Sequence, residues 1–199
     1  MTTDVHVWLD PSCPWAWQTM IWLRGLRDAG EIAMTFDTFS LEVNARTEPM
    51  PYAEAAPTYG EALAALALAQ REGGDAAYET LYVGICERLH DRNEPMSRAL
   101  LDEAAASLDG TLVARACGPL FEELGATVTA GWRAAREADV FGVPTLRIGD
   151  AKVVYGPILA AAPIGEDAAR LWERVKGLAD LDTFFELKRW PRDVRPGER

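Results

Sequence analysis

The N-terminal part of the chain carries a strand pattern, then a helix pattern, then a second strand pattern. Val5–Asp10 is short and rich in β-forming residues, and its alternating Val and Leu positions predict a strand. Large hydrophobic residues at three- and four-residue spacings over Trp15–Ala29 predict a helix, which Gly30 ends. Ile32–Leu41 predicts the next strand. A strand, a helix and a strand this close together are typical of a parallel βαβ unit.

The middle of the chain, Tyr52–Asp139, is rich in Ala, Leu and Glu and contains almost no β-type run. Its three- and four-residue spacings predict several helices. They comprise a helix that begins at Asp75 as N-cap, one that begins at Ser97 as N-cap, one over Leu112–Leu120 that bends or stops at Gly118-Pro119, and one over Thr127–Ala138.

The pattern returns to β-structure after this helical block. Pro144–Ile148 and Lys152–Tyr155 are two short β-type runs, and Gly149-Asp150 between them is a hairpin signal. Gly165–Leu181 predicts a final helix, and Trp190–Arg199 predicts a loose tail because it is polar and rich in Pro and Arg. The order of elements is therefore β-α-β, a group of helices, and β-β-α.

Length, composition and charge narrow the class of protein. The chain has 199 residues, of which 49% are hydrophobic and 26% charged, so it suits one globular domain or one domain with a large insertion. The longest apolar run, Ala62–Ala69, is far too short to span a membrane. A net charge of −11 argues against nucleic-acid binding, because phosphate neutralisation needs clustered Lys and Arg. Met1–Asp10 lacks the positive region of a targeting signal, so we expect a cytoplasmic protein.

The chain contains three cysteines, Cys13, Cys86 and Cys117, and two histidines, His6 and His90. An odd number of widely spaced cysteines argues against a disulfide framework and against a four-cysteine zinc site. So few cysteines and histidines predict no metal centre, and the absence of both glycine-rich phosphate motifs predicts no flavin or nicotinamide site. Because a cytoplasm keeps thiols reduced, any cysteine chemistry in this chain should be catalytic.

Cys13 lies where the first predicted strand ends and the first predicted helix begins, with Pro14 at the first helical position. Unpaired backbone N–H groups and the positive end of the helix dipole meet there, and both stabilise a thiolate. We therefore expect an exposed Cys13 thiol whose pKa lies below the ordinary value of about 8.5, and which acts as a nucleophile at neutral pH. The alternative is a buried structural cysteine.

Two motifs around the helical block resemble those of a known family. Asp10-Pro11-Ser12-Cys13-Pro14-Trp15-Ala16-Trp17 and Val140-Phe141-Gly142-Val143-Pro144-Thr145 resemble the DsbA-like branch of the thioredoxin fold. Within this branch, the sequence is most similar to the actinobacterial mycothiol-dependent nitroreductase group. Five further motifs resemble those of this group: Ser40-Leu41, Gly156-Pro157, Gly165-Glu166, Leu171-Trp172 and Phe184-Phe185-Glu186-Leu187-Lys188-Arg189.

The resemblance implies an α/β, thioredoxin-like fold (β-α-β … β-β-α) with an inserted all-helical subdomain. Residues 1–51 and 140–189 would form the thioredoxin-like domain, 52–139 the helical insertion and 190–199 a loose C-terminal tail. It also implies a cis bond between Val143 and Pro144 opposite Cys13, where the Val143 backbone pairs with a bound thiol. The implied cofactor is a low-molecular-weight thiol, either mycothiol or a similar molecule.

One departure from the family pattern changes the expected chemistry. The second cysteine of the group's Cys-x-x-Cys motif is replaced by Ala16, so Cys13 cannot form the internal disulfide of a dithiol enzyme. Cys86 and Cys117 lie on apolar helix faces and are expected in the core. Three functions stay open. The first is monothiol redox chemistry, in which a second thiol molecule resolves Cys13. The second is thiol transfer or isomerisation, as in kappa-class glutathione transferases and hydroxychromene carboxylate isomerases. The third is binding of a ligand or partner without redox activity.

Aromatic residues near Cys13 indicate the class of substrate. Trp15 is expected beside the sulfur with Trp17 close by, while Tyr52 and Tyr59 open the helical insertion, and such a pocket suits an aromatic electrophile or a disulfide. Asn44 resembles an Asn of the group that lies near the active site. The expected partners are small molecules, and the protein is expected to be a monomer or a homodimer. Core roles are expected for four tryptophans, and a structural role or a surface position is expected for each histidine: Trp8, Trp22, Trp132 and Trp172, and His6 and His90.

Overall fold

The computed structural model describes residues 2–47, 59–150, 153–189 and 196–197, and these contain a four-stranded mixed sheet. The strands are β1 (Thr3–Leu9), β2 (Ile32–Thr38), β3 (Thr145–Ile148) and β4 (Val153–Tyr155). Their order across the sheet is β2-β1-β3-β4, with β1 parallel to β2 and with β3 antiparallel to both β1 and β4. This arrangement confirms the predicted βαβ unit and the predicted hairpin.

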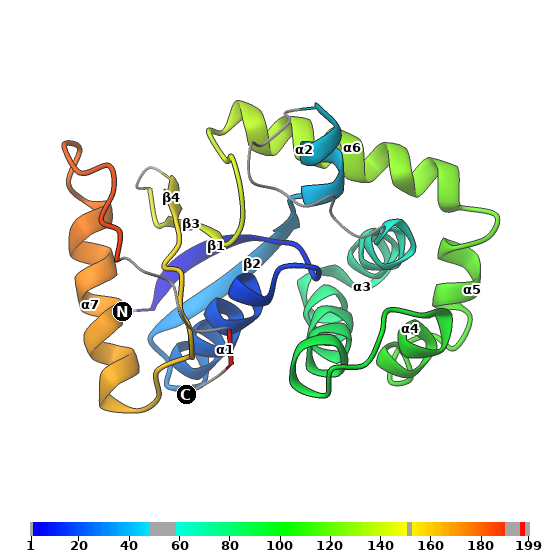
Figure 1. Ribbon diagram of the computed structural model, residues 1–199, viewed down its shortest axis with the longest axis horizontal. Coiled ribbons are helices and arrows are strands. Elements are labelled where there is room, and N and C mark those ends of the chain that lie inside the picture. The colour runs from blue at the N-terminus through cyan, green and yellow to red at the C-terminus, as the bar shows by residue number, and fades with distance from the viewer. Residues whose placement is uncertain (1, 48–58, 151–152, 190–195, 198–199) are drawn as a thin grey trace.

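Two helices flank the sheet at one side of the molecule (Figure 1). They are α1 (Pro14–Asp28) and α7 (Glu166–Ala179), close to their predicted bounds. Trp22 and Trp172 meet edge to face at 6.1 Å between ring centroids, and the Trp22 indole N–H donates to the Ala168 carbonyl at 3.1 Å. Trp8 and Trp132 are also buried, so the predicted core role of these four tryptophans is confirmed.

The second predicted strand is shorter than expected, and a helix follows it. β2 ends at Thr38 rather than Leu41, and α2 occupies Leu41–Thr47. Two side chains begin this helix: the Ser40 hydroxyl accepts the Val43 N–H at 3.1 Å, and a carboxylate oxygen of Asp10 accepts the Leu41 N–H at 2.8 Å. Capping of this kind ends the strand and starts the helix.

The remaining helices lie between β2 and β3 in the chain and gather beside the sheet in Figure 1, with α6 running across the top. Among the described residues, no helix is both long and apolar enough to cross a membrane. The elements are α3 (Gly60–Cys86), a π-helical turn η1 (Glu87–Asp91), α4 (Arg98–Ala104), α5 (Leu112–Ala116) and α6 (Phe121–Glu137).

The long helix α3 consists of two helical stretches that meet at a kink, because Gly74 has a non-helical backbone with φ 63° and ψ −159°. The second stretch begins next to Asp75, which agrees with the predicted start of a helix there. The Asp75 carboxylate accepts the Phe36 N–H of β2 at 3.3 Å. The predicted Ser97 cap of α4 is confirmed, since its hydroxyl accepts the Leu100 N–H at 3.2 Å. Helix α5 ends before Gly118-Pro119, as predicted.

A row of aromatic rings ties α3 to the sheet. Phe36 of β2 stacks on Tyr78 at 5.6 Å between centroids, and Tyr78 stacks on Tyr82 at 6.1 Å. The Tyr78 hydroxyl also lies 3.1 Å from the Thr38 hydroxyl. Because all three rings are buried, this row fixes α3 against the end of β2.

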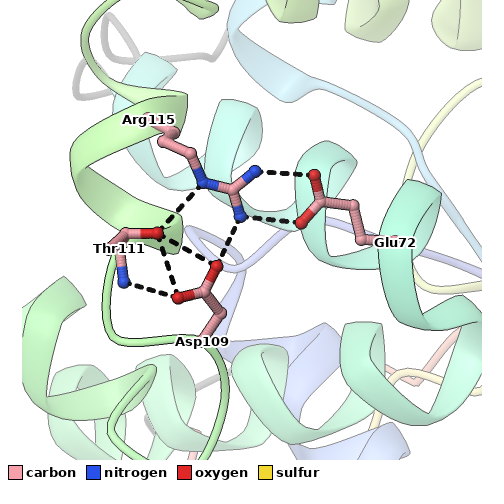
Figure 2. A network of polar contacts seen from close by, with 4 residues as sticks. All are labelled: Glu72, Asp109, Thr111 and Arg115. Carbon is pink, nitrogen blue, oxygen red and sulfur yellow. Dashed lines mark hydrogen bonds and ion pairs between the residues drawn. The ribbon is translucent and has the colours of Figure 1, made fainter.

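A polar network on the surface connects α5 to α3 (Figure 2). The Arg115 guanidinium donates to both carboxylate oxygens of Glu72 at 2.7 Å and to Asp109 at 2.8 Å. Asp109 in turn accepts the N–H and the hydroxyl of Thr111. The Arg115 guanidinium holds the pKa of the Glu72 carboxyl below its ordinary value. The two-pronged geometry orients α5 against the part of α3 that precedes Gly74.

Gly84 is expected to be required where α4 crosses α3. A Cβ at Gly84 would lie 2.9 Å from the carbonyl oxygen of Ala104 and 3.1 Å from its Cα. Both are backbone atoms, so Gly84→Ala must displace α4. We expect the substitution to lower the free energy of unfolding by about 1–3 kcal/mol, measured by urea denaturation.

Gly25 provides the matched control for this prediction. It lies inside α1, and a Cβ there would meet nothing within 4 Å. Gly25→Ala should leave the stability unchanged or raise it by up to about 1 kcal/mol through helix propensity. Equal effects of the two substitutions would contradict a steric role for the α3–α4 crossing.

Candidate active site

Cys13 is the N-cap of α1, and Pro14 takes the first helical position. The Cys13 backbone is extended, with φ −92° and ψ 108°, and its sulfur accepts the Ala16 N–H at 3.4 Å. Ser, Thr, Asp and Asn oxygens usually make this bond. Here a sulfur takes the place of the capping oxygen and faces the positive end of the helix.

A buried carboxylate holds the loop that carries Cys13. One oxygen of Asp10 accepts the Ser12 N–H at 2.8 Å and the Ser12 hydroxyl at 2.6 Å, and its other oxygen accepts the Leu41 N–H. The Asp10 carbonyl also accepts the Cys13 N–H at 3.1 Å. Burial raises the pKa of Asp10, whereas these hydrogen bonds lower it. The Asp10 side chain therefore ties the Asp10–Cys13 loop to the start of α2, and the Asp10 backbone holds the Cys13 end.

The loop before β3 lies opposite Cys13. The Cys13 S–H donates to the Val143 carbonyl at 3.8 Å, across 130 residues of chain. The peptide bond between Val143 and Pro144 is cis. The Thr145 hydroxyl donates to the Gly142 carbonyl at 2.7 Å, and the Pro144 carbonyl accepts the Gly156 N–H at 2.8 Å. These bonds on both sides of Val143 hold its carbonyl toward the sulfur.

The expected exposure and low pKa of Cys13 are both wrong. Its side chain is only 8% exposed, and burial raises its pKa to about 11. The N–H groups of Ala16 and Trp15 lower that pKa, as the position at the helix start predicted, but the nearby Asp10 carboxylate raises it further. Loss of water around the sulfur exceeds the stabilisation from the helix N-terminus. The predicted place of Cys13 at the start of the first helix is confirmed, whereas its predicted exposure to solvent is wrong.

The residues that follow Cys13 are mostly buried. Ala16 is fully buried, and Trp17 is 2% exposed, with its indole N–H donating to Asp91 at 2.9 Å. The Trp17 ring thus offers almost no surface to a ligand. Trp15 is partly buried and packs against the hydrophobic core. Of the two tryptophans that follow Cys13, Trp15 is the more exposed.

Asn44 of α2 connects this helix to α6. It is buried, and its side-chain oxygen accepts the Trp132 indole N–H of α6 at 3.2 Å. Tyr59 is half-buried, and its pKa is raised by burial and by the nearby Asp10 and Cys86. Tyr52 lies outside the described residues, so its predicted role remains a prediction.

A cavity of about 650 Å³ opens between α2, α3, α4 and α6. Tyr59, Met96 and Phe121 contribute to its wall, together with the charged side chains of Glu42 and Arg46. Cys13 does not line it. The cavity is therefore distinct from the immediate surroundings of the sulfur.

Of the other two cysteines, Cys86 lies against the loop that carries Cys13, and Cys117 contacts the start of α3. Cys86 is fully buried, as predicted, and its S–H points to the Pro11 carbonyl at 3.9 Å. Cys117 is only half-buried, and its S–H donates to the Glu61 carbonyl at 3.7 Å. Burial raises the pKa of Cys117 to about 11 and that of Cys86 well above its ordinary value. All three cysteines are free thiols.

Sequence reasoning missed two groups around Cys13. Asp10 belongs to the Asp-Pro-x-Cys motif, but the sequence analysis predicts no role for its side chain. An acidic residue at the end of a buried strand needs hydrogen-bond donors, and this requirement could have indicated its role. His90 was expected to be structural or on the surface, yet its Nε2 lies 2.9 Å from the Pro11 carbonyl. No local pattern pairs His90 with Pro11.

In the described part of the chain, no cluster of three or more His, Cys, Asp or Glu could hold a metal ion.

The sheet order, the cysteine at the start of α1 and the facing Val143-Pro144 loop define a DsbA-like protein of the thioredoxin fold. Solved structures of this class share the fold. A 2-hydroxychromene-2-carboxylate isomerase aligns with a TM-score of 0.61 at 15% identity, over 87% of this chain and 94% of that one. The probable DsbA oxidoreductase SCO1869 of Streptomyces coelicolor aligns with a TM-score of 0.60 at 17% identity, over 96% of this chain and 97% of that one. The cytosolic disulfide reductase DsbM of Pseudomonas aeruginosa, solved with GSH, aligns with a TM-score of 0.57 at 15% identity, over 87% of this chain and 99% of that one.

The sequence assigns the family within this class. The model of the Rv2466c-like family, described as mycothiol-dependent nitroreductase Rv2466c, matches residues 12–189, and the chain belongs to that family. The Mycobacterium tuberculosis protein Rv2286c is 31% identical over 207 residues, which cover 97% of this chain and 84% of that protein. The family is one of thiol-dependent enzymes, and its description implies a low-molecular-weight thiol.

We expect alkylation of Cys13 by iodoacetamide to be slow at neutral pH. Because only the thiolate reacts, the rate should rise about tenfold per pH unit and approach a plateau near pH 11, where the raised pKa lies. Since folding favours the protonated thiol, the associated stability is present below the ordinary thiol pKa and is lost as pH rises through 11.

Peptide mass analysis should follow the modified cysteine in this experiment. Cys117→Ser removes the half-buried thiol that would otherwise add background, and Cys13→Ser identifies the signal. A plateau below pH 8.5 would contradict the dominance of burial and restore the expectation of an activated thiolate.

Proposed function

We propose that this protein is a monothiol oxidoreductase that uses Cys13 and a low-molecular-weight thiol to reduce a disulfide or an aromatic electrophile. The observation that carries the proposal is the geometry at the sulfur. Cys13 caps α1, accepts the Ala16 N–H and faces the Val143 carbonyl, while alanine stands where a second cysteine would lie. Such a site can exchange thiols but cannot form a disulfide with its own motif.

The residues present fit a small thiol such as mycothiol. Cys13 supplies a sulfur for exchange, and the Val143 backbone opposite supplies polar groups that pair with a bound thiol. Ala16 presents no thiol that would compete for the mixed disulfide. When bound, the small thiol supplies the second sulfur and the electrons that the chain itself lacks.

The exchange balances without a second protein cysteine. The Cys13 thiolate attacks a disulfide RS–SR′, forms Cys13–S–SR and releases R′S⁻. Attack by one small thiolate MS⁻ on the sulfur of R then regenerates the Cys13 thiolate and releases the mixed disulfide MS–SR. A second small thiolate attacks the M sulfur of MS–SR and releases RS⁻ and the disulfide MS–SM, so two small thiols are oxidised for each RS–SR′ reduced.

The backbone N–H groups at the helix start have a defined task in this reaction. The Cys13 proton must leave before attack, and the raised pKa makes this costly in the free protein. The Ala16 and Trp15 N–H groups offset part of that cost because they donate to the developing thiolate. The Val143 carbonyl accepts the S–H in the resting state and orients the sulfur toward its loop.

The proposed substrate class is supported by the family description and by the partly exposed ring of Trp15 next to Cys13. The family's mycothiol-dependent nitroreductase description supports small-molecule chemistry, and Trp15 provides an aromatic surface beside the cysteine loop. We retain a cytoplasmic location, action without flavin, and a monomer or homodimer as parts of the proposal. The division into a thioredoxin-like domain, residues 1–51 and 140–189, and a helical insertion, residues 52–139, also remains a proposal.

The raised pKa favours a second candidate function. If Cys13 keeps its proton, its S–H can donate to the thiolate of a bound small thiol and lower that thiol's pKa. The bound thiolate would then add to an electrophile or catalyse an isomerisation, with no bond to Cys13. This alternative uses the same sulfur position but makes the protein a thiol transferase or isomerase.

Intact-mass analysis after incubation with oxidised mycothiol separates the two candidates. We expect a stable mixed disulfide on the wild-type protein and on Cys117→Ser, and none on Cys13→Ser. Turnover of an electrophile without any adduct would favour the transferase or isomerase. A protein that shows neither adduct nor turnover would be a binding protein that has lost redox activity.

Ala16→Cys tests the importance of the missing cysteine directly. Residue 16 already lies within reach of Cys13, since its N–H contacts the sulfur. The variant should replace the mixed disulfide with an internal disulfide between Cys13 and the introduced cysteine, seen as the loss of two hydrogens from the reduced mass. Ala16→Ser controls for the added volume and should keep the mixed disulfide. If Ala16→Cys kept the mixed disulfide with mycothiol, the absence of a cysteine at position 16 would not be the reason for monothiol chemistry.

A further inference from the structure

The π-helical turn η1 at the end of α3 contacts both segments that determine where Cys13 lies. His90 Nε2 is 2.9 Å from the carbonyl oxygen of Pro11, in the loop that ends at Cys13. Asp91 accepts the indole N–H of Trp17, in the helix that Cys13 caps. Turns of this type occur often at functional sites.

The direction of the His90 hydrogen bond is unambiguous. A carbonyl oxygen only accepts, so Nε2 must carry the proton and donate it. Burial lowers the pKa of His90, which keeps the imidazole neutral at pH 7. The neutral ring with its proton on Nε2 is therefore the form that holds the Pro11 carbonyl.

The Pro11 carbonyl has one further side-chain donor among the described residues. The Cys86 S–H lies 3.9 Å from it, and a thiol is a weak donor. His90 is accordingly the stronger of the two contacts. Asp10 fixes the side of the loop that faces α2, and His90 fixes the side that faces α3.

We propose that His90 is a positioning residue for Cys13. By donating to the Pro11 carbonyl, it holds the loop so that the Cys13 sulfur stays at the start of α1 and opposite Val143. Asp91 supports the same placement by fixing Trp17 of α1. The inference rests on the proposed function of Cys13 as the reacting thiol, and it names a residue outside the Cys-Pro-Trp-Ala motif.

Loss of this contact should change the environment of the sulfur. Water is largely excluded from Cys13 because the loop lies against its neighbours, and the titratable groups around it are Asp10, Tyr82 and Cys86. A loop released from η1 admits water to the sulfur. Hydration favours the thiolate, so the thiol should become easier to ionise.

The test compares His90→Leu, which removes the donor, with His90→Gln, which keeps an N–H donor. The measurement is the rate of Cys13 alkylation against pH, followed by peptide mass analysis on the full chain. In His90→Leu we expect the midpoint to fall by about one pH unit or more, so that alkylation at pH 8 becomes about tenfold faster. His90→Gln should keep the wild-type profile.

His6→Leu is the matched control, because it makes the same substitution at the other histidine. His6 lies on β1, where its ring contacts the Thr35 hydroxyl at 2.8 Å and Asp37 at 3.0 Å. This variant should lower the melting temperature without moving the Cys13 profile. An unchanged profile in folded His90→Leu, or equal shifts in the Leu and Gln variants, would overturn the proposal.

Asp91→Ala and Asp91→Asn form a second pair should His90→Leu fail to fold. Asn keeps the acceptor for the Trp17 indole, whereas Ala removes it. The Ala variant should shift the Cys13 profile in the same direction and the Asn variant should not. Equal profiles for both variants would contradict the role of η1.

The alkylation readout separates this inference from the proposed function. A shifted profile in His90→Leu together with no mixed disulfide on the wild-type protein would refute the monothiol reaction and leave the positioning role intact. A mixed disulfide on the wild-type protein with an unshifted His90→Leu profile would refute the positioning role alone.

Discussion

The buried carboxylate of Asp10 is the constraint on which the site depends. It accepts hydrogen bonds from Ser12 and Leu41, so one group sets the path of the cysteine loop and the start of α2. A carboxylate is costly to bury unless hydrogen bonds replace its water, and here they offset part of that cost, since burial still raises the pKa of Asp10. Because Asp10 directly follows β1, the end of the central sheet is coupled to the position of Cys13.

Two opposing effects meet at the Cys13 sulfur. The start of α1 provides N–H groups that favour the thiolate, while the surrounding side chains exclude water and favour the thiol. Burial is the larger effect in the free protein. The site therefore holds the Cys13 thiol between the start of α1 and the Val143 carbonyl.

Predictions from local patterns succeeded where the determinants are close in sequence. The hairpin before Tyr155, the Ser97 cap and the place of Cys13 at the helix start each depend on a few neighbouring residues. The end of β2 was predicted wrongly because a distant group decides it: the Asp10 carboxylate accepts the Leu41 N–H. The helix boundary beside Gly74 was predicted from local residues, whereas the hydrogen bond from the Phe36 N–H of β2 to the Asp75 carboxylate joins distant segments. Tyr52 and most of the expected tail lie outside the described residues, although the Gly197 N–H donates to the Ala160 carbonyl.

The sequence by itself determined the element order, the family resemblance, the cysteine at the start of α1 and the alanine that replaces its partner. These depend on residue type and spacing along the chain. Only the tertiary structure decided how deeply Cys13 is buried and that His90 reaches Pro11. The reason is physical: burial, and with it the pKa of a thiol, depends on segments brought together from far apart in the chain, and no local pattern records which segments those are.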